Sequence, residues 1–225
     1  MGAHDPINDP VFRSLAADPS TGVVLFRFDG TVLFGNDQAA RIFMGPGARA
    51  ADYIGRNYRD WMPPAYVASR DEMHRELVEQ GKPMLIRALW NGFQHVTWLQ
   101  FIPDVPDGGR AHDPAAGRFL AITRRVEGNL AERITVAGEF VRVDSDQIRL
   151  GDLDVLTPRE LEVLALIGQN LASREIASLL GCAEKTIEKH RESIGAKLKV
   201  AHRAQLADLA QRAGLTLEDA SRARV

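Results

Sequence analysis

Residues 156–200 read LTPRELEVLALIGQNLASREIASLLGCAEKTIEKHRESIGAKLKV, and this stretch decides the fold of the C-terminal part of the chain. Thr157 can cap a helix, and Glu160, three residues later, can complete a capping box. Pro158 stands at the first helical position, where its missing N–H costs nothing. The sequence therefore predicts a helix from Pro158 to about Gln169.

Two further helices follow from similar signals. Ser173 is placed to cap a helix that continues through Leu180, and Gly181 then ends it. A helix over residues 184–198 has the spacing to bury Ile187, Ile194 and Leu198 while its polar residues face outward. Two helices joined by a short turn, the second with a polar outer face, are the plan of a helix-turn-helix.

The same stretch resembles the LuxR family, also called the GerE or FixJ type, almost position by position. The resemblance implies an all-α, four-helix domain over residues 151–214 that binds double-stranded DNA. It makes 173–180 the scaffold helix, 184–198 the recognition helix and 203–213 a dimerising helix. The bases would be read by Glu188, Lys189 and Glu192, and the phosphates would be held by Arg174, Lys185, Thr186, His190, Arg191 and Lys197. The dimer contact would be made by Leu206, Leu209 and Ala213.

The recognition helix departs from the family pattern at two positions. Glu188 stands where the commonest pattern has Lys, and a glutamate there can accept a hydrogen bond from cytosine N4. Ala183 replaces the usual capping Ser, which removes about 0.5 to 2 kcal/mol of helix stability, partly offset by Glu184 in the first turn. The alternative is a merely solvated face, on which Glu188 and Glu192 repel each other weakly.

The N-terminal half has the element order of a PAS domain. A hairpin is predicted over residues 21–34 around Asp29-Gly30, a second strand pair over 84–90 and 94–103 around Asn91-Gly92, and a fifth strand over 118–126. Helices are predicted at 37–43 and 65–80, and a long loop at 104–117. Asn36, which opens the first helix, and the segment GRNYRDWM at 55–62 also match this family. Residues 8–126 therefore resemble a PAS-like sensor or dimerisation domain, an α+β fold with an antiparallel five-stranded sheet and helices. Another small α+β sensor fold is the alternative.

A PAS domain can hold a small ligand between its sheet and its helices. The candidate lining residues are Phe26, Phe43, Tyr58, Trp61, Met62, Met84, Trp90, Trp98 and Phe101, all of which could equally be core. Tyr58 stands where light-sensing LOV domains carry the cysteine of the flavin adduct, so that photochemistry is excluded. His74 suggests haem, but related haem sensors carry the ligand one turn earlier, where this chain has Arg70; we expect no haem, and the cofactor stays unknown.

The segment between the halves, residues 127–150, has two interpretations. Leu130, Ile134, Ala137, Val141, Asp144 and Ile148 have alternating four and three spacing, as in a helix that pairs with its own copy. The β-branched run ITVAGEFVRV, with Gly138 inside it, favours an extended arm or a broken helix. Residues 215–225 are expected to form a C-terminal tail.

Composition limits the class of protein. Cys182 is the only cysteine, so one chain can form neither a disulfide nor a multi-thiolate metal site. No apolar run approaches a membrane span, and the N-terminus has no signal-peptide pattern, so we expect a cytoplasmic protein. The net charge of -2 is modest, but basic residues outnumber acidic ones between residues 173 and 203. No nucleophile elbow, HExxH or Walker loop is present, so we predict no enzyme and no metal site.

Together these features predict a sequence-specific DNA-binding transcriptional regulator whose helix-turn-helix is controlled by an N-terminal PAS-like domain. The expected partners are double-stranded DNA, a second copy of the chain, a small-molecule ligand and RNA polymerase, with no membrane. One alternative is a ligand-free PAS interaction module, with DNA binding regulated by a partner protein. Another is a sigma-factor region-four-like protein, and phosphorylation control is not expected because an acidic pair and a phosphoacceptor Asp after an early strand are missing.

Overall fold

The computed structural model describes residues 9–103, 117–128 and 138–225. The chain divides into two compact units. The sheet unit consists of the described residues of 1–87, 96–125 and 136–144, and the helical unit consists of those of 88–95, 126–135 and 145–225. In the part of the chain that the structure describes, no helix is long and apolar enough to cross a membrane.

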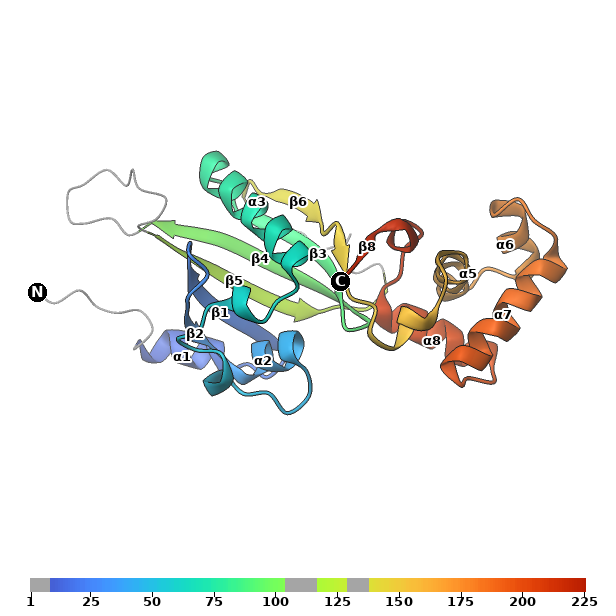
Figure 1. Ribbon diagram of the computed structural model, residues 1–225, viewed down its shortest axis with the longest axis horizontal. Helices are drawn as coiled ribbons and strands as arrows, with labels where there is room; N and C mark the ends of the chain where they lie inside the picture. Colours follow the sequence, from blue (N-terminus) through green and yellow to red (C-terminus); the bar gives the residue numbers. More distant parts are fainter. Residues whose placement is uncertain (1–8, 104–116, 129–137) are drawn as a thin grey trace, which may run out of the picture. The chain divides into compact units, whose positions relative to one another are not determined.

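The sheet that gives the first unit its name has the strand order β2-β1-β5-β4-β3-β6 (Figure 1). Its strands are β1 (Thr21–Arg27), β2 (Val32–Gly35), β3 (Met84–Trp90), β4 (Phe93–Pro103), β5 (Gly117–Arg125) and β6 (Val141–Asp144). Its helices are α1 (Pro10–Ala16), α2 (Asp37–Met44) and α3 (Pro64–Gln80), with short 3-10 turns η2 (Ala50–Asp52) and η3 (Tyr58–Asp60). The PAS-like element order is therefore confirmed.

Local signals explain why these elements form. The β1–β2 hairpin turns at Asp29-Gly30, where Gly30 adopts φ +93°. Asn36 caps α2, because its Oδ1 accepts hydrogen bonds from the backbone N–H groups of Ala39 and Val23, both at 3.0 Å. The same side chain thereby fixes the start of α2 against β1. Helix α1, which begins after Asp9, was not predicted.

The sheet has one strand more than predicted. Strand β6 pairs with β3 in parallel, with Met84 opposite Val141 and Arg87 opposite Asp144. The prediction of a five-stranded, purely antiparallel sheet was therefore incomplete. In the described part of the 127–150 segment the extended alternative is correct, because β-branched residues such as Val141 and Val143 favour a pleated strand over a helix.

The other residues of the predicted self-pairing helix fall into two groups. Leu130, Ile134 and Ala137 lie outside the described residues. Ile148 lies in the short strand β7 (Gln147–Ile148), so it belongs to no helix. Of the predicted loop at residues 104–117, residues 104–116 lie outside the described part of the chain, and Gly117 already begins β5.

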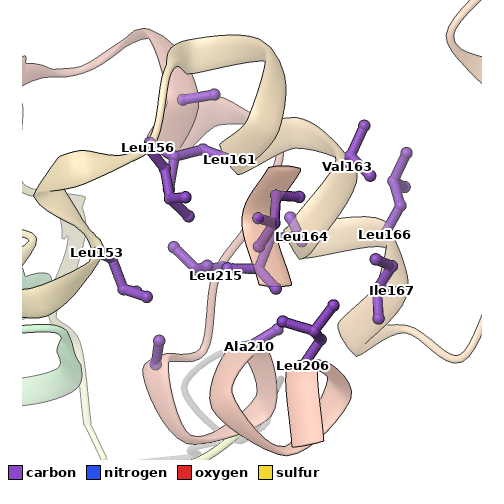
Figure 2. Packing of buried hydrophobic residues seen from close by; sticks show 14 of the residues in the cluster. Leu153, Leu156, Leu161, Val163, Leu164, Leu166, Ile167, Leu206, Ala210 and Leu215 are labelled. Atoms are coloured by element: carbon purple, nitrogen blue, oxygen red, sulfur yellow. The ribbon is translucent and has the colours of Figure 1, made fainter. Parts of the chain in front are cut away.

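The helical unit is built around four helices. They are α5 (Pro158–Gly168), α6 (Ser173–Leu179), α7 (Glu184–Leu198) and α8 (Arg203–Ala213), preceded by the 3-10 turn η4 (Gly151–Val155). Figure 2 shows Leu161 and Leu164 of α5 packed with Leu206 and Ala210 of α8 and with Leu215. The predicted four-helix organisation is therefore confirmed.

The C-terminal residues are part of this unit and not a loose tail. The 3-10 turn η5 (Glu218–Ser221) leads into β8 (Ala223–Arg224), which pairs in parallel with β7. Arg224 donates a hydrogen bond from Nη2 to the Leu156 carbonyl at 2.9 Å. The end of the chain therefore holds the segment that leads into α5.

Candidate nucleic-acid interface

The recognition helix α7 has one buried and one exposed face. Ile187 and Ile194 point into the core of the unit. On the opposite side the exposed residues follow one another at the spacing of a helix face. They are Lys185, Glu188, Lys189 and Glu192. Among the described residues these four side chains make no hydrogen bond or ion pair, so their charges are available to a ligand.

The other predicted DNA contacts also lie at the surface of the helical unit. Arg174 on α6 and Thr186 on α7 are exposed, and His190 and Arg191 are half-buried. The structure thus brings the predicted set onto α6 and α7. Their contacts with DNA remain a prediction.

Lys197 differs from the rest, because its ammonium group has a partner within the unit. Its Nζ donates to Glu160 Oε2 at 2.6 Å, and Ser193 Oγ donates to Glu160 Oε1 at the same distance. Glu160 is only 4% exposed, and its Oε2 also accepts from the Thr157 backbone N–H at 2.8 Å. These donors hold the pKa of the Glu160 carboxyl at about 2 despite the opposing effect of burial.

This arrangement ties α7 to the start of α5. The predicted capping box of Thr157 and Glu160 is present, and both oxygens of Glu160 also accept from α7, Oε2 from Lys197 and Oε1 from Ser193. Ser193 and Lys197 lie four residues apart, so both reach the same carboxylate from one side of the helix. Sequence reasoning missed this role, although the i, i+4 spacing of Ser193 and Lys197 was a usable signal.

Two arginines that sequence reasoning also missed hold the scaffold helix α6. Arg159 donates from Nη2 to the Leu180 carbonyl at 2.8 Å, at the end of α6. Arg203 donates to the Leu171 carbonyl, just before α6. Both carbonyls belong to the turns around a short helix, and a charged donor to each fixes the helix at its two ends.

The helix starts differ in how they are capped. The prediction that Ser173 caps α6 was wrong, because Ala172 is the capping residue and Ser173 is already helical. Glu175 accepts from the Ala172 backbone N–H at 2.6 Å. The capping residue before α7 is Ala183, which makes no side-chain capping bond, as its sequence indicates. The recognition helix therefore begins without the hydrogen bond that caps α5.

The predicted dimer contact needs a correction. Leu206 and Ala213 are 2% and 1% exposed and belong to the core against α5, so they are not free to face a partner. The helical stripe that they share with Ala210 packs inward, because α8 needs an apolar face to join this small core. Leu209 is half-exposed and is the one residue of the three left at the surface.

In the sheet unit, three of the candidate lining residues meet in one place. Phe26, Tyr58 and Phe101 join His74 and Phe119, and we call these five residues the aromatic cluster. The ring of His74 stacks on that of Phe119 at 4.6 Å between centroids and lies 5.2 Å from that of Phe26. Burial, reinforced by Arg70, lowers the pKa of His74 to about 3, so the imidazole is neutral at physiological pH.

The three tryptophans among the candidate lining residues have other partners. Trp61 contacts Tyr53, and Trp98 contacts Phe140. Trp90 belongs to the helical unit, where its ring lies 5.4 Å from the Arg149 guanidinium. The remaining three are Met62 and Met84, which are buried, and Phe43, which is half-buried. In the described ranges, no group of three or more His, Cys, Asp or Glu is placed to hold a metal ion.

Comparison with known proteins supports the assignment of the helices. Residues 154–210 match the family described as "Bacterial regulatory proteins, luxR family". A "Putative HTH-type transcriptional regulator" of Mycobacterium bovis is 39% identical over 59 residues, which are 26% of this chain and 7% of that protein. The uncharacterized response regulatory protein YgeK of Escherichia coli is 38% identical over 79 residues, 34% of this chain and 54% of its own length. The chain thus spans only a small part of the first relative and about half of the second.

Similar solved structures cover more of the chain at low identity. The complex of VqmA from Vibrio cholerae with ligand and DNA is 18% identical, covers 94% of this chain and 92% of that one, and has a TM-score of 0.48. A light-oxygen-voltage domain is 15% identical over 57% of this chain and 93% of its own, with a TM-score of 0.38. The C-terminal helices of this chain form a helix-turn-helix domain of the luxR type.

Proposed function

We propose that this protein is a sequence-specific DNA-binding transcriptional regulator, in which α7 docks in the major groove of double-stranded DNA. The observation that carries the proposal is the exposed polar face of α7 in a domain of the luxR type. A helix fits the major groove and presents its N-terminal half to the base edges. Helix α6 then lies behind α7 as the scaffold.

The exposed side chains divide into two kinds of contact. Glu188, Lys189 and Glu192 read bases, since Lys donates to guanine O6 and N7 and Glu accepts from cytosine N4. The phosphates are held by Arg174, Lys185, Thr186, His190, Arg191 and Lys197. Because Lys197 also pairs with Glu160, its phosphate contact is shared with a structural role. A target site with G·C pairs at the contacted positions follows.

Selection of binding sites from random duplex DNA, followed by fluorescence anisotropy at several salt concentrations, tests the proposal. Lys189→Ala should weaken binding to the selected site by about 1 to 3 kcal/mol. Lys82→Ala is the matched control, because this lysine pairs with Glu139 at 2.8 Å in the sheet unit. Equal affinities of wild type and Lys189→Ala for the selected site would refute the assignment of α7 as the reading helix.

Glu188→Gln tests the acidic base contact in particular. Glutamine pairs with adenine N6 and N7, so the preferred base at one position should change from cytosine to adenine. Removing one negative charge should also raise affinity for unrelated DNA, because the carboxylate repels phosphates. An unchanged site preference would mean that Glu188 faces solvent in the complex.

The sheet unit is proposed to sense a signal and to control whether the helix-turn-helix docks. A ligand acts only if its affinity differs between the docking and non-docking forms. The aromatic cluster, whose rings stack on one another, is the proposed place for a small ring compound. The second candidate is a ligand-free dimerisation module controlled by a partner protein. Native mass spectrometry and an absorption spectrum of freshly purified protein separate the two, since a bound molecule excludes the ligand-free form.

The proposal also includes the location, the oligomeric state and the partners of the protein. The protein would act in the cytoplasm as a homodimer on two half-sites, where it would contact RNA polymerase, and it would catalyse no reaction. Footprinting on a selected site reports the length protected, and transcription with purified polymerase reports the direction of the effect. Protection of a single half-site at saturation would contradict the dimer.

A further inference from the structure

The turn between β3 and β4 contributes to the core of the helical unit. Leu89, at the end of β3, is 0% exposed and belongs to the same hydrophobic cluster as Leu150 and Leu164. Residues 88–95 accordingly group with the helices and not with the remainder of their strands. The helical unit is thus completed by chain that lies far before it in the sequence.

Backbone hydrogen bonds fix this turn to the segment that precedes η4. The Arg149 N–H donates to the Leu89 carbonyl at 2.9 Å, and the Gly92 N–H donates to the Arg149 carbonyl at 3.1 Å. The approach is close, because a Cβ at Gly92 would lie 2.9 Å from the Leu150 carbonyl oxygen. The turn and the entry to the helices therefore form one packed layer.

The same turn also meets the end of α8. Gly214 follows α8 at φ +59°, and a Cβ there would lie 2.5 Å from Gln94 Nε2. Gln94 is buried and donates from Nε2 to the Gly128 carbonyl at 2.8 Å. The Gly128 N–H in turn donates to the Gln211 carbonyl of α8 at 2.8 Å. The turn thus holds both ends of the four-helix arrangement.

We infer that residues 88–95 are positioning residues for DNA binding. They fix the chain before α5 and after α8, and they continue directly into β3 and β4. This role rests on the proposed DNA binding, but its structural part can be tested without DNA.

Hydrogen exchange of the full chain provides the structural test, with two matched glycine variants. Gly214→Ala places a methyl group against Gln94. Gly81→Ala puts an alanine at a similar left-handed φ, +64°, but its methyl group would have no atom within 4 Å. Amide exchange in α5 and α8 should rise about tenfold more in Gly214→Ala than in Gly81→Ala. Equal protection of α5 and α8 in the two variants would overturn the inference.

Anisotropy with the selected DNA then separates positioning from mere stability. Gln94→Ala removes the hydrogen bond to Gly128 and should raise the dissociation constant severalfold, at a temperature where circular dichroism matches that of the wild type. An unchanged dissociation constant would overturn the positioning role. If the wild type itself binds no DNA, the proposed function fails together with this role, while the exchange experiment still decides whether the turn belongs to the helical unit.

Discussion

The two units have interiors of different chemistry. The core cluster of the helical unit consists of Leu, Ile, Val and Ala side chains. The aromatic cluster of the sheet unit instead encloses an imidazole among aromatic rings. Aliphatic side chains fix the shape of a core but carry no group that can gain or lose a proton. The imidazole in the aromatic cluster is such a group. The helical unit is therefore suited to present a fixed surface, and the sheet unit to respond to its surroundings.

The aliphatic core should show the largest response to a single substitution. Leu164→Ala removes a side chain that is fully buried between α5 and α8, and it should lower the free energy of unfolding by about 2 to 5 kcal/mol. Denaturant unfolding at neutral pH measures this loss. Leu179→Ala on α6 is the control, because that leucine is 64% exposed and should change stability by less than about 0.5 kcal/mol.

Acid should act on the aromatic cluster. The pKa of His74 is about 3 in the folded chain and near 6.5 when unfolded, so below pH 6.5 the unfolded chain takes up a proton that the folded chain does not. Stability is therefore present above pH 6.5 and is lost as the pH falls. The loss attributable to His74 should reach about 2 kcal/mol at pH 5. Denaturant unfolding at pH 7 and pH 5 measures it.

His74→Phe provides the control for the acid effect. It keeps an aromatic ring in the cluster and removes the titrating group, so the part of the acid effect due to His74 should disappear. Glu160 does not confuse the result, because its lowered pKa affects stability only below about pH 4.5. Equal losses in wild type and His74→Phe would show that the buried imidazole is not the responsive group.

Lys197→Ala tests whether the contact between α5 and α7 is structural. The variant leaves the buried carboxylate of Glu160 without its charged partner and should lower stability by about 1 to 2 kcal/mol. Lys189→Ala is the control, because this lysine is exposed on the same helix, about two turns before Lys197, and its loss should leave stability unchanged. If Lys197→Ala alters only DNA affinity, its ammonium acts on phosphates and not on the fold.

Much of the fold could be predicted because it depends on local sequence signals. The capping box at Thr157, the Asp29-Gly30 and Asn91-Gly92 turns, and the cap at Asn36 all lie within a few residues of the elements that they start or join. Strand β6 and the C-terminal pairing of β7 with β8 could not be found in this way. They depend on partners at distant positions, since β6 pairs with Met84–Arg87 and β8 with residues 147–148.

In the candidate site, too, the features that depend on local spacing could be predicted and those that depend on distant packing could not. Helical spacing indicates correctly that Lys185, Glu188, Lys189 and Glu192 are exposed, because exposure on a helix follows from its period. It did not reveal that Leu206 and Ala213 face inward, because a stripe of apolar residues can serve a dimer or a core equally well. Only the packing of α8 against α5 decides between the two.

The uncapped start of α7 gives the smallest predicted effect. Ala183 already has the extended backbone of a capping residue, at φ -76° and ψ 145°, but its side chain offers no acceptor. Ala183→Ser should therefore raise stability by about 1 kcal/mol, since the hydroxyl can accept from an N–H group in the first turn. Ala172→Ser at the start of α6 is the matched control. If α7 reads DNA with its first turns, only Ala183→Ser should also tighten binding to the selected site; an equal gain in both variants would assign the benefit to general stability.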